Sequence, residues 1–488
     1  MSEERKDVLL VTPIPPVATG LATYAMRVLQ NSLDFVNWTV AYPEGGDPGT
    51  LTSGIRSIRI DQISDMNVIP EIRIFQLGNS IHCFPVVQAL YRYGGTGLFH
   101  EIVLHHMLRF CYLESNQLEE YRRELRFCYG PNAESIEKEL FRKPSSLKEY
   151  DILLKRYPLI GRALHASSSA ICLSSYAETV LKDVFRPGRT CTIGHPLSSL
   201  PEIDVPEKPF DICIGILGSN HPGRNYSEIL EAVELFRKET PEAGLILIGG
   251  GYPEDNPEWV INCGRLPDSE YQGWIRTLDY AVDMRYPACG ETSGSLLEAM
   301  RAGVPCIVSA TGTFLNIPSD AVLRVPCDSM VQGIVRSLSY LHNRSDLRKS
   351  MSANCISYAE DTGSIERLRR DWKRIIRMAS ESGSDDLVLE SNSYSLSAAW
   401  HETPPGFTMD ISTEAVSWKY SGDVLIEGPP NSTEAEITVC GTGSVNGTEL
   451  PIEPGVMSVK GKDLSFTGEG RVFCVLWKYD RECVEYAG

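Results

Sequence analysis

The sequence lacks the patterns that are typical of several common protein classes. No run of about 18 uncharged apolar residues occurs, so we predict no transmembrane helix. The 14 cysteines form no Cys-x-x-Cys pair, which predicts buried free thiols rather than a zinc site or a disulfide framework. Glu3 and Glu4 precede a short apolar run, whereas a secretory signal starts with basic residues. We therefore expect a cytoplasmic protein, either free or peripheral at the inner membrane face.

Positive charge is also scarce. Lys and Arg number 46 against 64 Asp and Glu, so the formal net charge is −18. A surface of this sign repels the phosphates of DNA and RNA, and we expect no nucleic-acid partner. The acidity is uneven, because residues 385–488 alone hold 17 acids and 6 bases.

Motifs of several catalytic classes are absent as well. The sequence has no G-x(4)-G-K-[ST] loop, no G-x-G-x-x-G fingerprint and no G-x-S-x-G elbow. No Asp-x-Asp pair occurs either, so a carboxylate site that chelates a metal is not predicted. We expect neither a metal nor a resident cofactor.

What is present is an alternation of apolar strands and amphipathic helices, in a chain long enough for several domains. The 488 residues are 42% hydrophobic and 23% charged, which is a globular balance. Residues 7–12 (DVLLVT) predict a buried strand, followed by a Pro/Gly-rich loop and a helix over 21–33. A mononucleotide-binding βαβ unit opens in this way. This first unit covers residues 1–200, with a helical insertion at about 114–165.

The pattern restarts after a proline-rich linker. Residues 210–218 predict a new first strand, and the alternation continues to a closing helix near 363–380. The prediction is a second doubly wound α/β unit over residues 201–384. Residues 387–488 contain short β-rich runs between turns, which predict an all-β accessory domain of the sandwich or jelly-roll type. Its role is left open between glycan binding, contact with a partner protein or a second subunit, and stabilisation.

The strongest local signal is a glycine- and hydroxyl-rich turn that opens a helix, Glu291-Thr-Ser-Gly-Ser-Leu-Leu-Glu298. The amides of Gly294, Ser295 and Leu296 would face whatever lies at the helix start, where the helix dipole favours phosphate. Glu291 and Glu298 bracket the turn and could accept hydrogen bonds from sugar hydroxyls. The same residues also fit an acidic helix start without a ligand.

Three weaker signals follow predicted strands. Gly218 and Arg224 belong to a glycine-rich turn that ends in a cation, which fits a diphosphate clamp or an ordinary loop with a surface arginine. Gly20 lies in the first strand-to-helix loop and fits a ligand-facing or a simple turn glycine. His100 follows an apolar strand, where α/β sites lie, although a lone histidine also fits a structural role.

These residues resemble the retaining GT-B glycosyltransferases of the large bacterial and archaeal mannosyl- and glucosyltransferase group. That group carries a Glu-x7-Glu motif, which here reads GETSGSLLEAM with six residues between Glu291 and Glu298. ILGSNHPGRNYSEILEA resembles its phosphate-clamp segment, with Arg224 at the lysine position and Ser219 at the position of an additional arginine. LFHEIVLHHML resembles a first-domain stretch with a His-Asp pair, in which Glu101 replaces the aspartate.

The resemblance covers roughly residues 7–380 and implies two Rossmann-like domains that face each other across a cleft. It implies metal-free transfer, with retention, of a hexose from a UDP- or GDP-linked sugar to a glycan, lipid-linked or protein acceptor, as in polysaccharide biosynthesis. The leaving phosphate would help to deprotonate the acceptor. The implied catalytic residues are His100, Glu291 and Arg224, and the implied donor-binding residues are Gly20, Gly218, Arg224, Gly264, Arg265, Leu266, Gly294, Ser295, Leu296 and Glu298.

Two other functions share this architecture. An enzyme of the glycogen phosphorylase type would need a lysine for pyridoxal phosphate, and the second unit has few lysines near its predicted site. A GT-B scaffold with weak or no catalysis, which binds a sugar nucleotide or a partner protein, is the other alternative.

Overall fold

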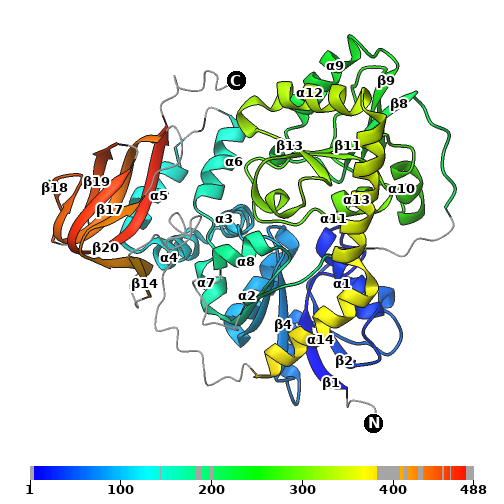
Figure 1. Ribbon diagram of the computed structural model, residues 1–488. Helices are drawn as coiled ribbons and strands as arrows, with labels where there is room; N and C mark the ends of the chain where they lie inside the picture. Colours follow the sequence, from blue (N-terminus) through cyan, green and yellow to red (C-terminus); the bar gives the residue numbers. More distant parts are fainter. Residues whose placement is uncertain are drawn as a thin grey trace.

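The chain is built from two parallel α/β sheets followed by an antiparallel sheet (Figure 1). No helix within the described part of the chain is long and apolar enough to cross a membrane. The computed structural model describes residues 5–142, 144, 146–181, 190–197, 203–381, 407–411, 416–426, 432–452, 455–461 and 463–479.

The first sheet has seven parallel strands in the order β3-β2-β1-β4-β5-β6-β7. Its central strands are buried on both faces, which is why they read as nearly continuous apolar runs. The strands are β1 (Lys6–Val11), β2 (Val36–Tyr42), β3 (Arg56–Arg59), β4 (Ile72–Leu77), β5 (Gly95–Phe99), β6 (Ser167–Cys172) and β7 (Thr190–Thr192). The helices are α1 (Gly20–Gln30), α2 (Phe84–Tyr93), α3 (His105–Glu114), α4 (Leu118–Tyr129), α5 (Ala133–Leu140), α6 (Leu147–Arg156), α7 (Gly161–His165) and α8 (Ser175–Leu181).

The second sheet has six parallel strands in the order β10-β9-β8-β11-β12-β13. The strands are β8 (Ile212–Leu217), β9 (Ala243–Ile248), β10 (Val260–Gly264), β11 (Tyr280–Asp283), β12 (Cys306–Ser309) and β13 (Val322–Val325). The helices are α9 (Tyr226–Arg237), α10 (Asp268–Ile275), α11 (Gly294–Arg301), α12 (Met330–His342) and α13 (Ser345–Gly363). Short 3₁₀ helices in the two units are Pro48–Thr50, Ile60–Asp65, Ile81–Cys83, Gly130–Asn132, Pro222–Arg224, Gly312–Asn316 and Cys327–Ser329.

Both parallel sheets share one topology, which confirms the prediction of two doubly wound units. The strand order reverses between β1 and β4 in the first sheet, and between β8 and β11 in the second. In such sheets the loops at the carboxyl ends of the strands part at this reversal and leave a crevice for a ligand. The loops after β1, β4, β8 and β11 are therefore the ones to inspect for a site.

The last helix of the α/β region, α14 (Ile365–Glu381), packs on the first unit rather than on the second. The sequence placed it at the close of the second unit. Its buried Trp372 instead lies in the first unit's core, edge-to-face against Trp38 with ring centroids 5.5 Å apart. Arg369 also forms a two-pronged ion pair with Asp34, at 2.9 and 2.5 Å. The chain thus crosses back and ties its two units together.

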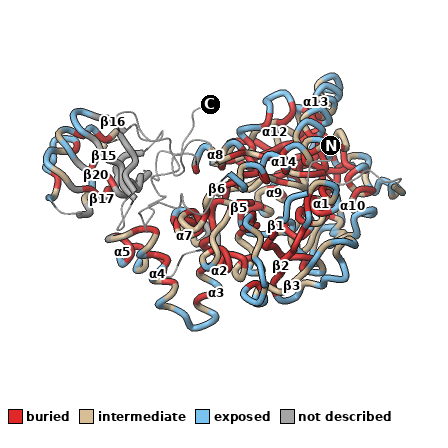
Figure 2. The backbone as a smooth tube through the Cα atoms, turned by 90° about the horizontal axis from the view of Figure 1, so that it is seen from below, coloured by how far each residue is buried: buried red, intermediate tan, exposed pale blue. Residues whose placement is uncertain are grey.

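The C-terminal region forms an antiparallel sheet, so the β-rich prediction is confirmed, while the sandwich or jelly-roll arrangement stays a prediction. Two long strands, β17 and β20, pair along most of their length, and Ile437, Val439 and Phe466 on them are fully buried. Figure 2 shows this sheet to one side of the α/β units, beside α4 and α5. The strands are β14 (Phe407–Ile411), β15 (Val416–Ser421), β16 (Val424–Ile426), β17 (Ser432–Val445), β18 (Thr448–Glu449), β19 (Gly455–Lys460) and β20 (Leu464–Tyr479).

Replacing Trp372 with alanine should destabilise the protein by about 3–5 kcal/mol, because a large buried side chain leaves a cavity in the first unit's core. Denaturant unfolding followed by circular dichroism measures this loss. Arg370→Ala, at an exposed position of the same helix, is the control and should stay within about 0.5 kcal/mol of the wild type. Equal losses in the two variants would contradict the packing of α14 on the first unit.

Candidate functional site

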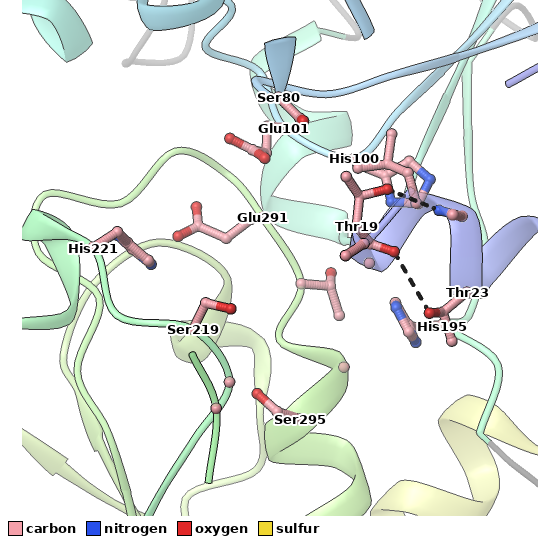
Figure 3. A pocket seen from close by; sticks show the side chains of 18 of the residues that line it. Thr19, Thr23, Ser80, His100, Glu101, His195, Ser219, His221, Glu291 and Ser295 are labelled. Carbon is pink, nitrogen blue, oxygen red and sulfur yellow. Dashed lines mark hydrogen bonds between the residues drawn. The ribbon is translucent and has the colours of Figure 1, made fainter. Parts of the chain in front are cut away.

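A cleft of about 880 Å³ lies between the two α/β units (Figure 3). Its first-unit wall comes from the loop after β1 and the start of α1, the loop after β4, the end of β5 and helix α6. Its second-unit wall comes from the loops after β8, β9, β10 and β11 and the start of α11. Both reversals of strand order therefore open into the same cavity.

All but two of the residues implied by the resemblance line this cleft. The exceptions are Leu296 and Gly264. The amide of Leu296 donates to the hydroxyl of Ser293 at 3.2 Å and its side chain is buried, so the implied amide contact is corrected to Gly294 and Ser295. The Gly264 amide donates to Asn262 Oδ1 at 3.1 Å. The residues brought together are Gly20, His100, Gly218, Arg224, Arg265, Leu266, Glu291, Gly294, Ser295 and Glu298.

Asp283, the last residue of β11, organises the second-unit wall. Its Oδ1 atom accepts from Arg224 at 2.7 Å and from Arg285 at 3.1 Å, and its Oδ2 atom accepts from Ser293 at 2.5 Å. Burial alone would raise the pKa of Asp283, but the two guanidinium groups hold it below its ordinary value. The carboxylate therefore stays ionised and keeps two cations side by side at the cleft.

Arg285 is a site residue that the sequence reasoning missed. Burial would lower its pKa, but Asp283 and Glu291 outweigh this effect and raise the pKa above the ordinary value. For Arg224, burial and the charge of Arg285 lower the pKa. The resemblance leaves Ser219 where a second cation is expected, and Arg285, from the loop after β11, places a second cation beside Arg224 on Asp283. A signal was available, because Arg285 lies in the run YAVDMRYP, which predicts a strand and its end in the second unit, and α/β sites lie at strand ends.

Two glycines on the second-unit wall are required by close contacts. Gly218 has φ +91°, and a Cβ atom there would lie 2.4 Å from Arg224 Nη2. A Cβ atom on Gly294 would lie 2.7 Å from the ring of His195. Ser293 caps α11, and the next amides along, those of Gly294 and Ser295, have no acceptor within the helix. The helix start therefore offers donors to the cleft beside the arginine pair.

Glu298 lies on the same helix and is already in ion pairs. Its Oε2 atom accepts from Arg301 at 2.6 Å and from Gln272 at 3.1 Å, and its Oε1 atom accepts from Arg27 at 3.0 Å. Arg27 belongs to α1 of the first unit, so this ion pair crosses the cleft. A ligand hydroxyl that binds Glu298 must share Oε1 with Arg27 or replace it.

Two neutral histidines face the cleft from the first-unit side. Burial, followed by the effect of His195, lowers the pKa of His100 to about 3. Burial and Arg27 lower the pKa of His195 to about 4. Within the described part of the chain, the buried Nε2 atom of His100 has no hydrogen-bond partner, and the ring packs edge-to-face on Tyr24 at 4.7 Å. His100 can therefore exchange a hydrogen bond with a ligand but cannot supply a positive charge at neutral pH.

A pair of carboxylates, Glu101 and Glu291, face each other across the cleft (Figure 3). Glu291 accepts from the backbone amide of Cys289 at 2.6 Å and lies 3.5 Å from Arg285. Burial, with the charge of Glu291 next, raises the pKa of Glu101 to about 7. Lys155 of α6 lines the cleft nearby, and its Nζ atom donates to the carbonyl of Pro287 at 2.7 Å.

Solved structures with the same architecture cover most of this chain. Anabaena HepE in complex with UDP and glucose is 11% identical and matches 77% of this chain and 100% of its own, with a TM-score of 0.53. Sucrose-phosphate synthase from Thermosynechococcus elongatus is 15% identical over 78% of this chain and 100% of its own, with a TM-score of 0.51. WaaG, a glycosyltransferase of lipopolysaccharide biosynthesis, is 14% identical over 76% of this chain and 99% of its own, with a TM-score of 0.50.

The chain has the GT-B fold. No family model matches its sequence, and no curated protein matches it in a sequence search. The GT-B fold explains why a cavity lined by both units lies between their sheets. Among the described residues of this GT-B chain, no group of three or more His, Cys, Asp or Glu side chains could hold a metal ion.

Replacing Asp283 with asparagine should destabilise the protein by about 3–5 kcal/mol at pH 7, because two buried guanidinium groups lose their shared counter-ion. Since the folded state lowers the pKa of Asp283, its contribution is complete above the ordinary value of 3.8 and fades as the pH falls through the folded value. Unfolding measured from pH 7 to pH 3 should show the gap between wild type and variant narrowing in acid.

The control for this comparison is Asp255→Asn, at an exposed position of the second unit, which should leave unfolding almost unchanged. A gap between wild type and Asp283→Asn that stays constant down to pH 3 would show that the carboxylate does not hold the arginine pair.

Proposed function

We propose that this protein is a glycosyltransferase that transfers a hexose, with retention and without a metal ion, from a UDP- or GDP-linked sugar to a glycan, lipid-linked or protein acceptor. The observation that carries the proposal is the meeting of Arg224, Arg285 and the free amides of α11 on one wall of a GT-B cleft. Two guanidinium groups and a helix start suit a diphosphate. The structure of HepE with UDP and glucose supports a uridine donor.

Each wall of the cleft has a distinct part in the proposed reaction. Arg224, Arg285 and the amides of Gly294 and Ser295 stabilise the negative charge that grows on the diphosphate as the bond to the sugar breaks. Because Asp283 fixes both arginines before the donor arrives, little reorganisation is needed. Arg265 and Leu266 lie beside the base of the nucleotide.

The remaining contacts orient the ribose and the sugar. Glu298 binds the ribose, and Arg27 yields Oε1 to it. Glu291 and the neutral ring of His100 hold the sugar hydroxyls from opposite sides of the cleft. A Cβ atom on Gly20 would meet nothing within 4 Å, so the start of α1 leaves room for the sugar.

Thermal unfolding with UDP-glucose, UDP-galactose, GDP-mannose and ADP-glucose tests the donor. A donor at about 100 times its Kd should stabilise the wild type by about 2.7 kcal/mol. Glu298→Ala should lose most of that stabilisation, whereas Glu270→Ala, on the exposed start of α10, should keep it. Hydrolysis of the same donor separates an enzyme from an inactive scaffold, and a wild type that no nucleotide sugar stabilises would overturn the proposal.

Removing either arginine should slow turnover by about 10²–10³-fold, because each one stabilises charge that develops in the transition state. Lys replacements should recover part of the loss, since an ammonium group keeps the charge without the two-pronged geometry of a guanidinium group.

EDTA should leave turnover unchanged. Turnover that EDTA abolishes and manganese restores would contradict the metal-free reaction.

A further inference from the structure

The two carboxylate oxygens of Glu298 are held by different units of the protein. The Oε2 atom accepts from Arg301 at 2.6 Å and from Gln272 at 3.1 Å, and both of these residues belong to the second unit. The Oε1 atom lies 3.0 Å from Nη2 of Arg27, which belongs to α1 of the first unit. Arg301 and Gln272 can therefore keep the carboxylate in place whether or not Arg27 stays paired with it.

Arg27 lies at the edge of the cleft rather than deep inside it. Its side chain is 18% exposed, against 4% for that of Glu298. A second contact anchors the guanidinium group, because Nη1 donates to the carbonyl of Pro196, at 2.6 Å, in the segment that leaves the first sheet after β7. Arg27 can therefore release Oε1, keep its contact with Pro196 and turn the freed nitrogen toward water. An arginine that regains water in this way is easier to separate from its partner than a wholly buried one.

A nucleotide bound as proposed brings its ribose to the same carboxylate oxygen. Gly294 opens α11 beside the arginine pair, and Glu298 follows four residues later on the same face of the helix, about 6 Å further along its axis. The ribose is the next group after the diphosphate, so a diphosphate at the helix start places the ribose near Glu298. Glu298 and Arg27 both line the cleft. The ribose hydroxyls and the guanidinium group therefore compete for Oε1.

We propose that Arg27 is a built-in competitor of the donor ribose, a role that rests on the proposed glycosyl transfer. While the guanidinium group holds Oε1, a ribose hydroxyl cannot take this position, and nucleotide binding has to replace the ion pair. The apparent Kd then equals the intrinsic Kd divided by the fraction of molecules in which Oε1 is accessible. The nucleoside diphosphate product is weakened by the same factor, so Arg27 limits inhibition by the product.

The test removes the guanidinium group and measures nucleotide affinity by calorimetric titration. The probe is UDP, GDP or ADP, chosen to match the nucleotide sugar that most stabilises the wild type, together with the 2′,3′-dideoxy analogue of the same nucleotide. Arg27→Met should lower the Kd of the ribonucleotide by about 5–30-fold. The analogue has no hydroxyl to offer Glu298 and leaves Oε1 to Arg27, so its Kd should not fall.

Arg27→Gln is a second variant, because its amide can still donate to the carbonyl of Pro196, and it should show the same tightening. Arg56→Met removes an exposed arginine from the same unit and is the matched control for the loss of one positive charge. It should bind both ligands as the wild type does.

A ribonucleotide Kd that is unchanged or higher in both Arg27 variants would overturn the competition and leave the proposed function intact. An equal fall in the Kd of the dideoxy analogue would do the same, because the effect would then not act through the ribose hydroxyls. A wild type that binds none of the nucleotide sugars and none of the three nucleoside diphosphates would overturn both the competition and the proposed function.

Discussion

The arrangement of the second-unit wall depends on one buried carboxylate. Asp283 holds Arg224, Arg285 and Ser293 at once, and Ser293 in turn caps the helix whose amides face the cleft. Two guanidinium groups this close would repel each other without a shared counter-ion. The position of Asp283 is itself rigid, because it ends a fully buried parallel strand. The strand thus fixes the charge, the charge fixes the arginines, and the cap fixes the helix start.

The two units are also joined by contacts that cross the cleft. Arg27 pairs with Glu298, Lys155 donates to the carbonyl of Pro287, and the amide of Ile102 donates to the carbonyl of Cys289 at 2.9 Å. These contacts lie next to residues proposed to bind the donor. A bound donor would therefore compete for atoms that also hold the two units together. The ion pair of Glu298 is the clearest case, because a ribose would compete with a residue of the other unit.

Local sequence patterns identified the turns that line the site better than they identified its charged residues and their partners. Gly218, Gly294 and Ser295 follow predicted strands or open a predicted helix, and all of them line the cleft. Leu296 was placed with them because the sequence cannot show that the Ser293 hydroxyl takes its amide. Arg224 was expected to be free for a ligand, whereas the structure engages it with Asp283, a residue 59 positions away. Lys155 also lines the cleft, but it was not predicted because its helix, α6, belongs to an insertion without a recognisable motif.

The sequence by itself determined the two doubly wound units, the β-rich tail and the loops at which a site would form. Apolar periodicity and turn residues are local, and they fix which segments become strands and which loops follow them. Only the tertiary structure decided that α14 packs on the first sheet, that Arg285 completes the arginine pair, and that Glu101 faces Glu291. Each of these depends on which side chains meet across elements that are distant in the chain. Burial then shifts the pKa values of the charged groups, and no local sequence pattern predicts those shifts.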